Sequence, residues 1–253
     1  MNREYWNGLA NKYEDEIFDV LSSDKKHLIC KLIKKYGGAA KTAGDFGCGP
    51  GRFLPMLSAN FSQVNAIDIS YKFIASAKNK YKHLSNIKYI TTDLAKSGLR
   101  LEKTHFALSV NMLIMPALAT RVRILDVMAK HILKNGHLVL VVPALESAML
   151  TDFRLIEWNL RDGVSPSSAE RASFGSPKKS NRRYLRQGIV PIDNVPTKHY
   201  LKEELIAMLE SRKMRIINIR KIEYLWKTEF ASPPRWMKEP YPWDWLVVAQ
   251  KTK

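Results

Sequence analysis

A glycine-rich segment with one acidic residue is the part of this chain whose composition and spacing could do chemistry. Positions 44–52 read Gly-Asp-Phe-Gly-Cys-Gly-Pro-Gly-Arg, so Asp45 precedes Gly47, Gly49 and Gly51. Glycines this close let a strand turn sharply into a helix and let a ligand approach the backbone. The dinucleotide fingerprint G-x-G-x-x-G would need glycine at position 52, where the chain has arginine. The spacing therefore disfavours a nicotinamide or flavin site, and Cys48 is expected to be a small turn residue rather than a nucleophile.

Four polar side chains stand at the ends of predicted strands. Asp45, Asp68, Asp93 and Asn111 each lie at or near the end of a short apolar run. In parallel sheets ligands bind beyond the carboxyl ends of the strands, so we expect these side chains to converge on one crevice. Each aspartate alone could instead cap a helix or form a turn. Three of them after a glycine-rich turn favour a ligand site.

Strands and helices alternate from the glycine turn onward. The pattern predicts strands at 42–46, 63–67, 87–91, 106–110 and 137–142, and helices at 52–59, 70–81 and 120–133, with a turn at 134–136. Residues 137–142 are continuously apolar, as in a strand that is buried on both faces. Alternation of this kind predicts an α/β fold with a parallel sheet.

The flanking regions follow other patterns. Apolar residues recur at helical spacing over residues 1–36, and 144–160 also looks helical. Residues 161–198 are rich in Ser, Pro and Arg, and we expect them to be irregular. A helix at 201–213 and strands at 214–226 and 243–250 complete the expected elements.

Several motifs resemble class I S-adenosylmethionine (SAM) dependent methyltransferases. The segment 45–51 matches their motif I, D-x-G-x-G-x-G, and Trp6, Ala10 and Tyr13 match an N-terminal W-x-x-x-A-x-x-Y pattern. Residues 133–137 resemble the L-K-P-G-G turn before strand five, with Asn and His replacing Pro and Gly. The chain is most similar to the ubiquinone- and menaquinone-biosynthesis type (methyltransferase domain type 11 or 25), over about residues 5–145 and 199–250.

The resemblance implies a fold and a cofactor. The fold would be a Rossmann-like, mostly parallel sheet with an antiparallel last strand and helices on both faces, and the cofactor would be SAM. The chain would form one domain, 1–253, whose parts are N-terminal lid helices (1–36), a cofactor-binding core (42–143), a substrate-recognition insert (144–198) and the C-terminal part of the core (199–253).

It also implies roles for single residues. Tyr13 would cap the methionyl end of SAM, Asp68 would accept both ribose hydroxyls, and Asp93 would lie near the adenine amino group. The implied cofactor-binding residues are Tyr13, Asp45, Gly47, Cys48, Gly49, Gly51, Asp68, Ile69, Asp93, Leu94 and Asn111. The chemistry agrees, because a carboxylate makes strong charge-assisted bonds to two hydroxyls and an acidic crevice suits cationic SAM.

The sequence says less about the methyl acceptor. In-line displacement from a sulfonium can work by orientation and exclusion of water, so no catalytic base is required. His199 and Tyr200 could reach the acceptor or could simply begin a surface helix. The N-P-P-Y or D-P-P-Y motif of enzymes that methylate exocyclic amines of nucleic-acid bases is missing after Asn111.

A basic segment and an aromatic tail are the other candidates for acceptor binding. Positions 171–190 hold six basic residues and no acid, so they could grip phosphate or form a solvated loop. We name Arg171, Arg182 and Arg183 from this segment, and Trp236 and Tyr241 as possible walls of the acceptor site or stacking surfaces for a base. Trp243 and Trp245 are expected to pack in the core.

Composition bounds the remaining possibilities. A net charge of +17 favours anionic partners or serves solubility. Two cysteines suit a reducing compartment, six histidines show no metal-ligand clustering, and no long apolar run is present, so we expect a cytoplasmic protein without a membrane span or metal. The expected acceptor is an anionic or aromatic small molecule. The alternative acceptor is RNA or a protein side chain. The alternative functions are a non-catalytic SAM-binding module and a nicotinamide enzyme.

Overall fold

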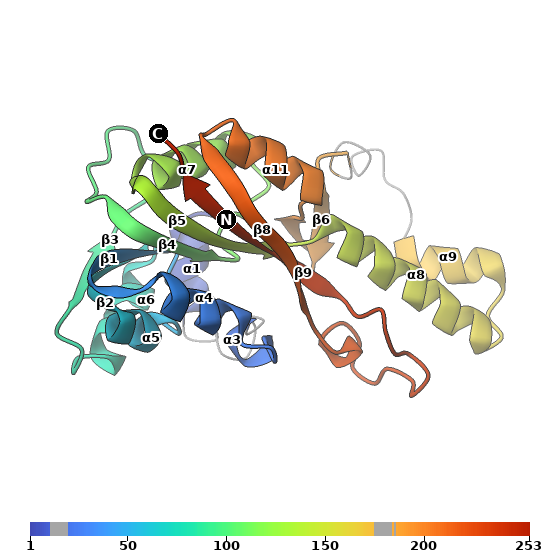
Figure 1. The fold of residues 1–253 in the computed structure, drawn as a ribbon. Coiled ribbons are helices and arrows are strands. Elements are labelled where there is room, and N and C mark those ends of the chain that lie inside the picture. The colour runs from blue at the N-terminus through green and yellow to red at the C-terminus, as the bar shows by residue number, and fades with distance from the viewer. Residues whose placement is uncertain (11–19, 175–183, 185) are drawn as a thin grey trace.

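A seven-stranded sheet forms the centre of the computed structural model, which describes residues 1–10, 20–174, 184 and 186–253 (Figure 1). The strand order is β3-β2-β1-β4-β5-β9-β8. The bounds are β1 Gly38–Phe46, β2 Phe61–Asp68, β3 Ile87–Thr91, β4 Thr104–Val110, β5 Ile132–Pro143, β8 Met214–Glu223 and β9 Trp243–Lys251. Strand β9 is antiparallel to both of its neighbours, and the other adjacent pairs are parallel. The predicted fold class is confirmed.

Helices cover both faces of this sheet because its strands alternate their apolar side chains between two layers. One layer of buried side chains joins α4 (Leu28–Tyr36), α5 (Leu54–Asn60) and α6 (Tyr71–Lys80) to the sheet. The other joins α7 (Leu118–Lys130) and α11 (Lys202–Glu210). Strand β5 lies between the layers, and its residues from Leu138 to Val142 are fully buried. Figure 1 shows α4 and α5 on one side of the sheet and α7 and α11 on the other.

The predicted turn at 134–136 lies inside β5 rather than before it. Helix α7 ends at Lys130, and Ile132 already pairs with Thr104 of β4. Ile132 is buried and β-branched, so it fits the sheet better than an extension of the helix. The register then shifts across the turn, where Asn135 has a φ of 66°. The helix expected over 120–133 was therefore too long at its C-terminal end.

The insert after β5 contains more regular structure than predicted. Helix α8 (Leu145–Arg161) agrees with the expected helix, but α9 (Pro166–Phe174) and the hairpin of β6 (Ile189–Ile192) and β7 (Val195–Lys198) replace part of the expected irregular stretch. Asp193 and Asn194 both have positive φ and form the two-residue turn that favours a hairpin. In Figure 1, α8 and α9 project from one end of the sheet.

The two termini contribute short elements. Helices α1 (Arg3–Leu9) and α3 (Val20–Ser23) precede α4, and a 3-10 turn, η1 (Trp226–Thr228), follows β8, which is three residues shorter than the predicted strand. Trp243 and Trp245 pack edge to face in the buried layer, as predicted. Within the described ranges, no helix has the length and apolarity needed to cross a membrane.

Candidate functional site

A cavity of about 1310 Å³ opens at the carboxyl ends of the parallel strands. The loops after β1, β2, β3 and β4 form its floor, α1 borders it, and the β6–β7 hairpin supplies another wall. Predicted site residues that line it are Asp45, Gly47, Cys48, Gly49, Asp68, Ile69, Asp93, Leu94 and Asn111. The structure thus brings together the strand-end residues that the sequence singled out.

The glycine-rich turn is shaped by positive φ angles. Gly47, Gly49 and Gly51 have φ of 76°, 54° and 84°, which side chains rarely tolerate. A Cβ on Gly47 would clash with the side chain of Met112 across the cavity floor. Gly51 does not line the cavity: a Cβ there would lie 2.6 Å from Leu54 Cδ1. Close packing against α5 accounts for a glycine at this position, and the predicted contact of Gly51 with the cofactor stays a prediction.

Asp68 holds the glycine turn and faces the cavity. Its Oδ2 accepts a hydrogen bond from the Gly49 amide at 2.9 Å, and its Oδ1 accepts one from the Ser70 amide at 2.8 Å. Burial raises the pKa of this carboxyl, and these amide bonds oppose that rise. A carboxylate has about four acceptor positions, so each oxygen keeps capacity for a ligand hydroxyl.

Asp45 is a buried acid with an unused oxygen. Its side chain is 3% exposed, and its Oδ2 has no hydrogen-bond partner among the described residues. Burial raises the pKa of Asp45 to about 8, and the negative charge of Asp68 adds to the effect. A cationic ligand beside this carboxyl would favour its ionised form.

The adenine end of the expected site is built by the loop after β3. Asp93 Oδ1 accepts a hydrogen bond from the Ala95 amide at 2.9 Å, and Leu94 is buried beside it. Helix α1 approaches the neighbouring loop after β2, since Arg3 Nε donates to the Ile69 carbonyl at 3.1 Å. Tyr13 lies outside the described residues, so its predicted role stays a prediction.

The lining of the cavity is acidic although the chain is strongly basic. The described lining residues include five acids, Glu4, Asp45, Asp68, Asp93 and Asp193, and three bases, Arg3, Arg52 and Lys96. This balance agrees with the acidic crevice expected from the sequence and suits a cation.

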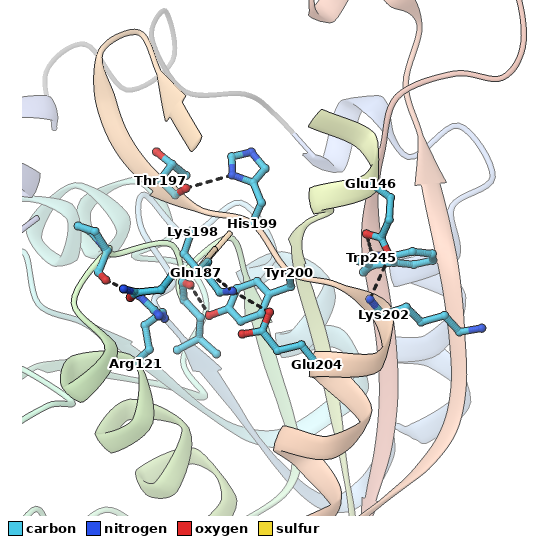
Figure 2. A network of polar contacts seen from close by, with 12 residues as sticks. Arg121, Glu146, Gln187, Thr197, Lys198, His199, Tyr200, Lys202, Glu204 and Trp245 are labelled. Atoms are coloured by element: carbon cyan, nitrogen blue, oxygen red, sulfur yellow. Dashed lines mark hydrogen bonds and ion pairs between the residues drawn. The ribbon is translucent and has the colours of Figure 1, made fainter. Parts of the chain in front are cut away.

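The loop after β4 forms an apolar wall and is held by hydrogen bonds to its carbonyl groups. Met112, Ile114 and Met115 line the cavity. Donors reach four successive carbonyls of this loop: the Tyr200 hydroxyl at 2.7 Å, the Lys198 amide at 2.8 Å, and the Arg121 guanidinium at 2.7 and 2.6 Å. Figure 2 shows how these donors gather around the loop. The wall is therefore preorganised by β7 and α7.

Lys198 anchors the β6–β7 hairpin over the same wall. Its side chain is 2% exposed, and its Nζ donates to the Gln187 carbonyl at 2.8 Å and to Glu204 Oε2 at 2.7 Å (Figure 2). The hairpin contributes Ile192, Asp193, Val195 and Thr197 to the cavity lining. One buried lysine thus links the loop after β4, the hairpin and α11.

We expect Lys198→Met to lower the free energy of unfolding by about 1–3 kcal/mol, because two hydrogen bonds of a buried amine are lost. The value is not larger, because the Glu204 side chain is 37% exposed and can turn to water. Urea unfolding would measure the change, and Lys202→Met, at an exposed position of the same segment, is the matched control. Equal stability of the two variants would contradict the anchoring role of Lys198.

The two proposed catalytic candidates are structural instead. His199 is buried, its Nδ1 lies 3.0 Å from the Thr197 carbonyl, and burial lowers its pKa to about 4. Tyr200 is buried, burial raises the pKa of its phenol, and its hydroxyl donates to the Leu113 carbonyl. Neither residue lines the cavity. Both are corrected from acceptor-contacting residues to supports of the hairpin and the loop.

The described substrate-binding candidates also lie away from the cavity. Arg171 is exposed on α9 and donates to Ser168 Oγ at 3.0 Å. Trp236 stacks under the Arg161 guanidinium at 4.0 Å, and Tyr241 borders a separate cavity of about 160 Å³. None of the three lines the large cavity. Arg182 and Arg183 lie outside the described residues.

Sequence reasoning missed the β6–β7 hairpin and its anchor. Its signal was present, since Asp193-Asn194 stands between the β-branched Ile192 and Val195. The ion pair of Lys198 with Glu204 had no comparable signal, because a lysine six residues before a glutamate usually lies in water.

The family comparison agrees with the site. Residues 44–136 match the family model described as a methyltransferase domain, and no curated protein sequence matches the chain. This segment is therefore similar in sequence to a methyltransferase domain. The whole chain has the fold of class I SAM-dependent methyltransferases, so the predicted resemblance is confirmed at the level of the family.

Solved structures extend the similarity over nearly the whole chain. The N-methyltransferase NodS from Bradyrhizobium japonicum WM9, in complex with S-adenosylhomocysteine (SAH), has a TM-score of 0.61 and 14% identity, covering 99% of this chain and 98% of that chain. The 1,6-didemethyltoxoflavin-N1-methyltransferase of Burkholderia thailandensis has a TM-score of 0.64 and 12% identity, and the match covers 99% of this chain and 87% of that chain. Magnesium protoporphyrin IX methyltransferase from Synechocystis PCC 6803, with bound SAM, has a TM-score of 0.60 and 14% identity, and the match covers 98% of this chain and 94% of that chain. The predicted cofactor agrees with the ligands of these proteins.

Proposed function

We propose that this protein is a SAM-dependent methyltransferase that acts on an aromatic or otherwise largely apolar small molecule. The supporting observation is the convergence of Asp45, Asp68 and Asp93, from three strand ends, on one cavity beside the glycine turn. The residues fit SAM: the glycine turn lines the cavity, Asp68 can accept hydroxyls, and the unpartnered oxygen of Asp45 suits an ammonium.

The residues of the chain bind and orient, and bound SAM supplies the activated methyl group. We assign the ribose to Asp68, the adenine end to Asp93 and Leu94, and the methionyl ammonium to Asp45. The preorganised loop after β4 and the hairpin hold the acceptor in line and exclude water, so a dedicated base is unnecessary. Tyr13 remains a proposed cap of the methionyl end.

The apolar wall favours an aromatic acceptor over an anionic one. The acceptor end is lined by apolar side chains, namely Met112, Ile114, Ile192 and Val195. Among the described hairpin residues that line the cavity, Asp193 carries a charge. The neighbour from Burkholderia was solved with bound 1,6-didemethyltoxoflavin, which also supports a small-molecule acceptor. The two cysteines are free thiols, so we place the protein in the cytoplasm.

Calorimetric titration with SAM and with NAD tests this function. We expect saturable, one-to-one SAM binding in the micromolar range and no heat of binding for NAD. The opposite preference would reject a methyltransferase and favour a nicotinamide enzyme. Titration of Asp126→Asn, an exposed acid on α7, controls for general effects of charge.

A further inference from the structure

The side-chain amide of Asn111 has a hydrogen-bond partner at its NH₂ end but none, among the described residues, at its oxygen. It follows β4 with a φ of 49°, and it lines the cavity. Its Nδ2 donates to Asp244 Oδ2 at 3.2 Å. Its Oδ1 is buried and accepts no hydrogen bond from any residue that the structure describes. A buried carbonyl oxygen without a donor is unfavourable, so a ligand that brings a donor would be stabilised here.

Asp244 and Tyr224 fix which end of the amide remains open. Both side chains are buried, and Asp244 Oδ2 also accepts the Tyr224 hydroxyl at 2.8 Å. An ionised carboxylate can only accept, so it must face the NH₂ end of Asn111. Burial raises the pKa of Asp244 to about 6, the Tyr224 and Asn111 bonds oppose this, and the charge of Glu229 adds to it. At neutral pH the carboxylate therefore holds the amide oxygen free for a ligand.

Two residues that line the cavity from neighbouring strands each hold an unpartnered buried oxygen. Asp45 belongs to β1 and Asn111 follows β4, which pairs with β1. The buried acid is matched to a charged donor, which SAM provides in its ammonium. The neutral amide oxygen needs a hydrogen-bond donor, and that donor need not carry a full charge. The methyl acceptor is the remaining partner in a methyl-transfer reaction.

We propose that Asn111 accepts a hydrogen bond from the N–H group of a neutral aromatic or heteroaromatic amine that receives the methyl group. Asp244 and Tyr224 are positioning residues, which keep the amide in the receptive orientation. The inference rests on the proposed function and adds the chemical class of the acceptor.

Nitrogen is favoured over oxygen because Asn111, the residue matched to the acceptor, is not a base. An amide oxygen cannot take up a proton, whereas a hydroxyl nucleophile must lose one early. A neutral amine attacks with its own lone pair: the N–C bond forms, the C–S bond breaks with its electrons on sulfur, and the N–H proton then passes to water. An aromatic amine is neutral at pH 7 and fits the walls formed by Met112 and Ile114.

The orientation of Asn111 can be tested without knowing the acceptor. SAH has an uncharged thioether sulfur at the transfer position. Sinefungin carries an ammonium group where SAM carries its sulfonium methyl, so it places N–H donors there. We expect the wild-type protein to bind sinefungin more tightly than SAH in calorimetric titrations. Asp244→Asn should reduce this preference by about tenfold, because asparagine can itself donate to Asn111 Oδ1 and release the amide. Tyr224→Phe should reduce it less, and Asp126→Asn should leave it unchanged.

The outcomes separate the inference from the proposed function. Failure of the wild-type protein to bind either ligand would reject SAM binding itself. An unchanged preference in Asp244→Asn, or an equal loss of affinity for both ligands, would overturn the positioning role, because SAH shares the ammonium but not the amine at the transfer position. Thermal unfolding of each variant identifies any loss that comes from misfolding.

A labelled-methyl assay tests the acceptor class. The probes are 2-naphthylamine, 2-naphthol and 2-naphthalenethiol, which share one ring system. We expect label from SAM on the amine. Label only on the oxygen or sulfur probe, or on none of them while SAM binds, would count against the proposal.

Discussion

Replacement of Asp68 by alanine should weaken SAM binding by at least about 100-fold, or about 2.7 kcal/mol. The proposed pair of charge-assisted bonds to the ribose hydroxyls would be lost, each worth about 1.5–3 kcal/mol. The substitution also removes the acceptor of the Gly49 and Ser70 amides, which shape the glycine turn. Isothermal titration calorimetry of wild type and variant would measure the loss.

Three companion variants separate binding from folding. Asp68→Asn keeps an oxygen that can accept from the Gly49 amide but turns an NH₂ group toward the Ser70 amide, so it should fold with a small loss of stability and still lose about tenfold or more in SAM affinity. Asp126→Ala, on the exposed face of α7, should bind like wild type. If Asp68→Ala bound SAM within threefold of wild type, the ribose assignment would be wrong. Asp93→Ala should cause a smaller loss, because it would affect a single contact at the adenine end.

Affinity for SAM should rise with pH by up to about 100-fold between pH 5.5 and 7.5. The free protein keeps Asp45 protonated below its pKa of about 8, whereas the ammonium of SAM favours the ionised form. Binding in this window therefore releases a proton, and the affinity gains up to about tenfold per pH unit. Titrations in buffers of different ionisation enthalpy would count the released protons, and Asp45→Asn should abolish most of the dependence.

The same carboxyl affects the stability of the ligand-free protein. Its pKa in the folded state lies above the ordinary value of 3.8, so its stabilising contribution is complete below about pH 4 and is lost as the pH rises toward 8. Added SAM should reverse this loss, so the ligand should raise the melting temperature more at pH 7.5 than at pH 5.5. A ligand-induced shift that is the same at both values would argue against an ammonium beside Asp45.

The cofactor half of the cavity could be predicted because local rules determine it. Glycine spacing, an acid at each strand end and the chirality of strand–helix–strand units place Asp45, Asp68 and Asp93 at one edge of the sheet without any long-range information. Strand β3 shows how strong the local signal was, since its predicted and observed bounds agree. Spacing alone cannot distinguish a glycine that contacts a ligand from one that packs against a helix, as Gly51 does against α5.

The acceptor half could not be predicted because long-range packing determines it. His199 and Tyr200 precede an amphipathic helix, and the parallel bridge from Tyr200 to Ala144 makes them internal. Trp236 and Tyr241 are aromatic residues in a prolyl loop, but that loop lies beside α8 and the segment that follows α3 rather than over the cavity. The contact of Asn111 with Asp244 spans 133 positions of the sequence, beyond the reach of any local pattern.

A crystal structure of the protein with bound SAH tests the central claim most directly. We expect the ribose between the two oxygens of Asp68, the adenine beside Asp93 and Leu94, and the ammonium within hydrogen-bonding distance of Asp45. A nucleoside bound outside this cavity, or one bound inside it with Asp45 and Asp68 turned away, would contradict the assignment of the site.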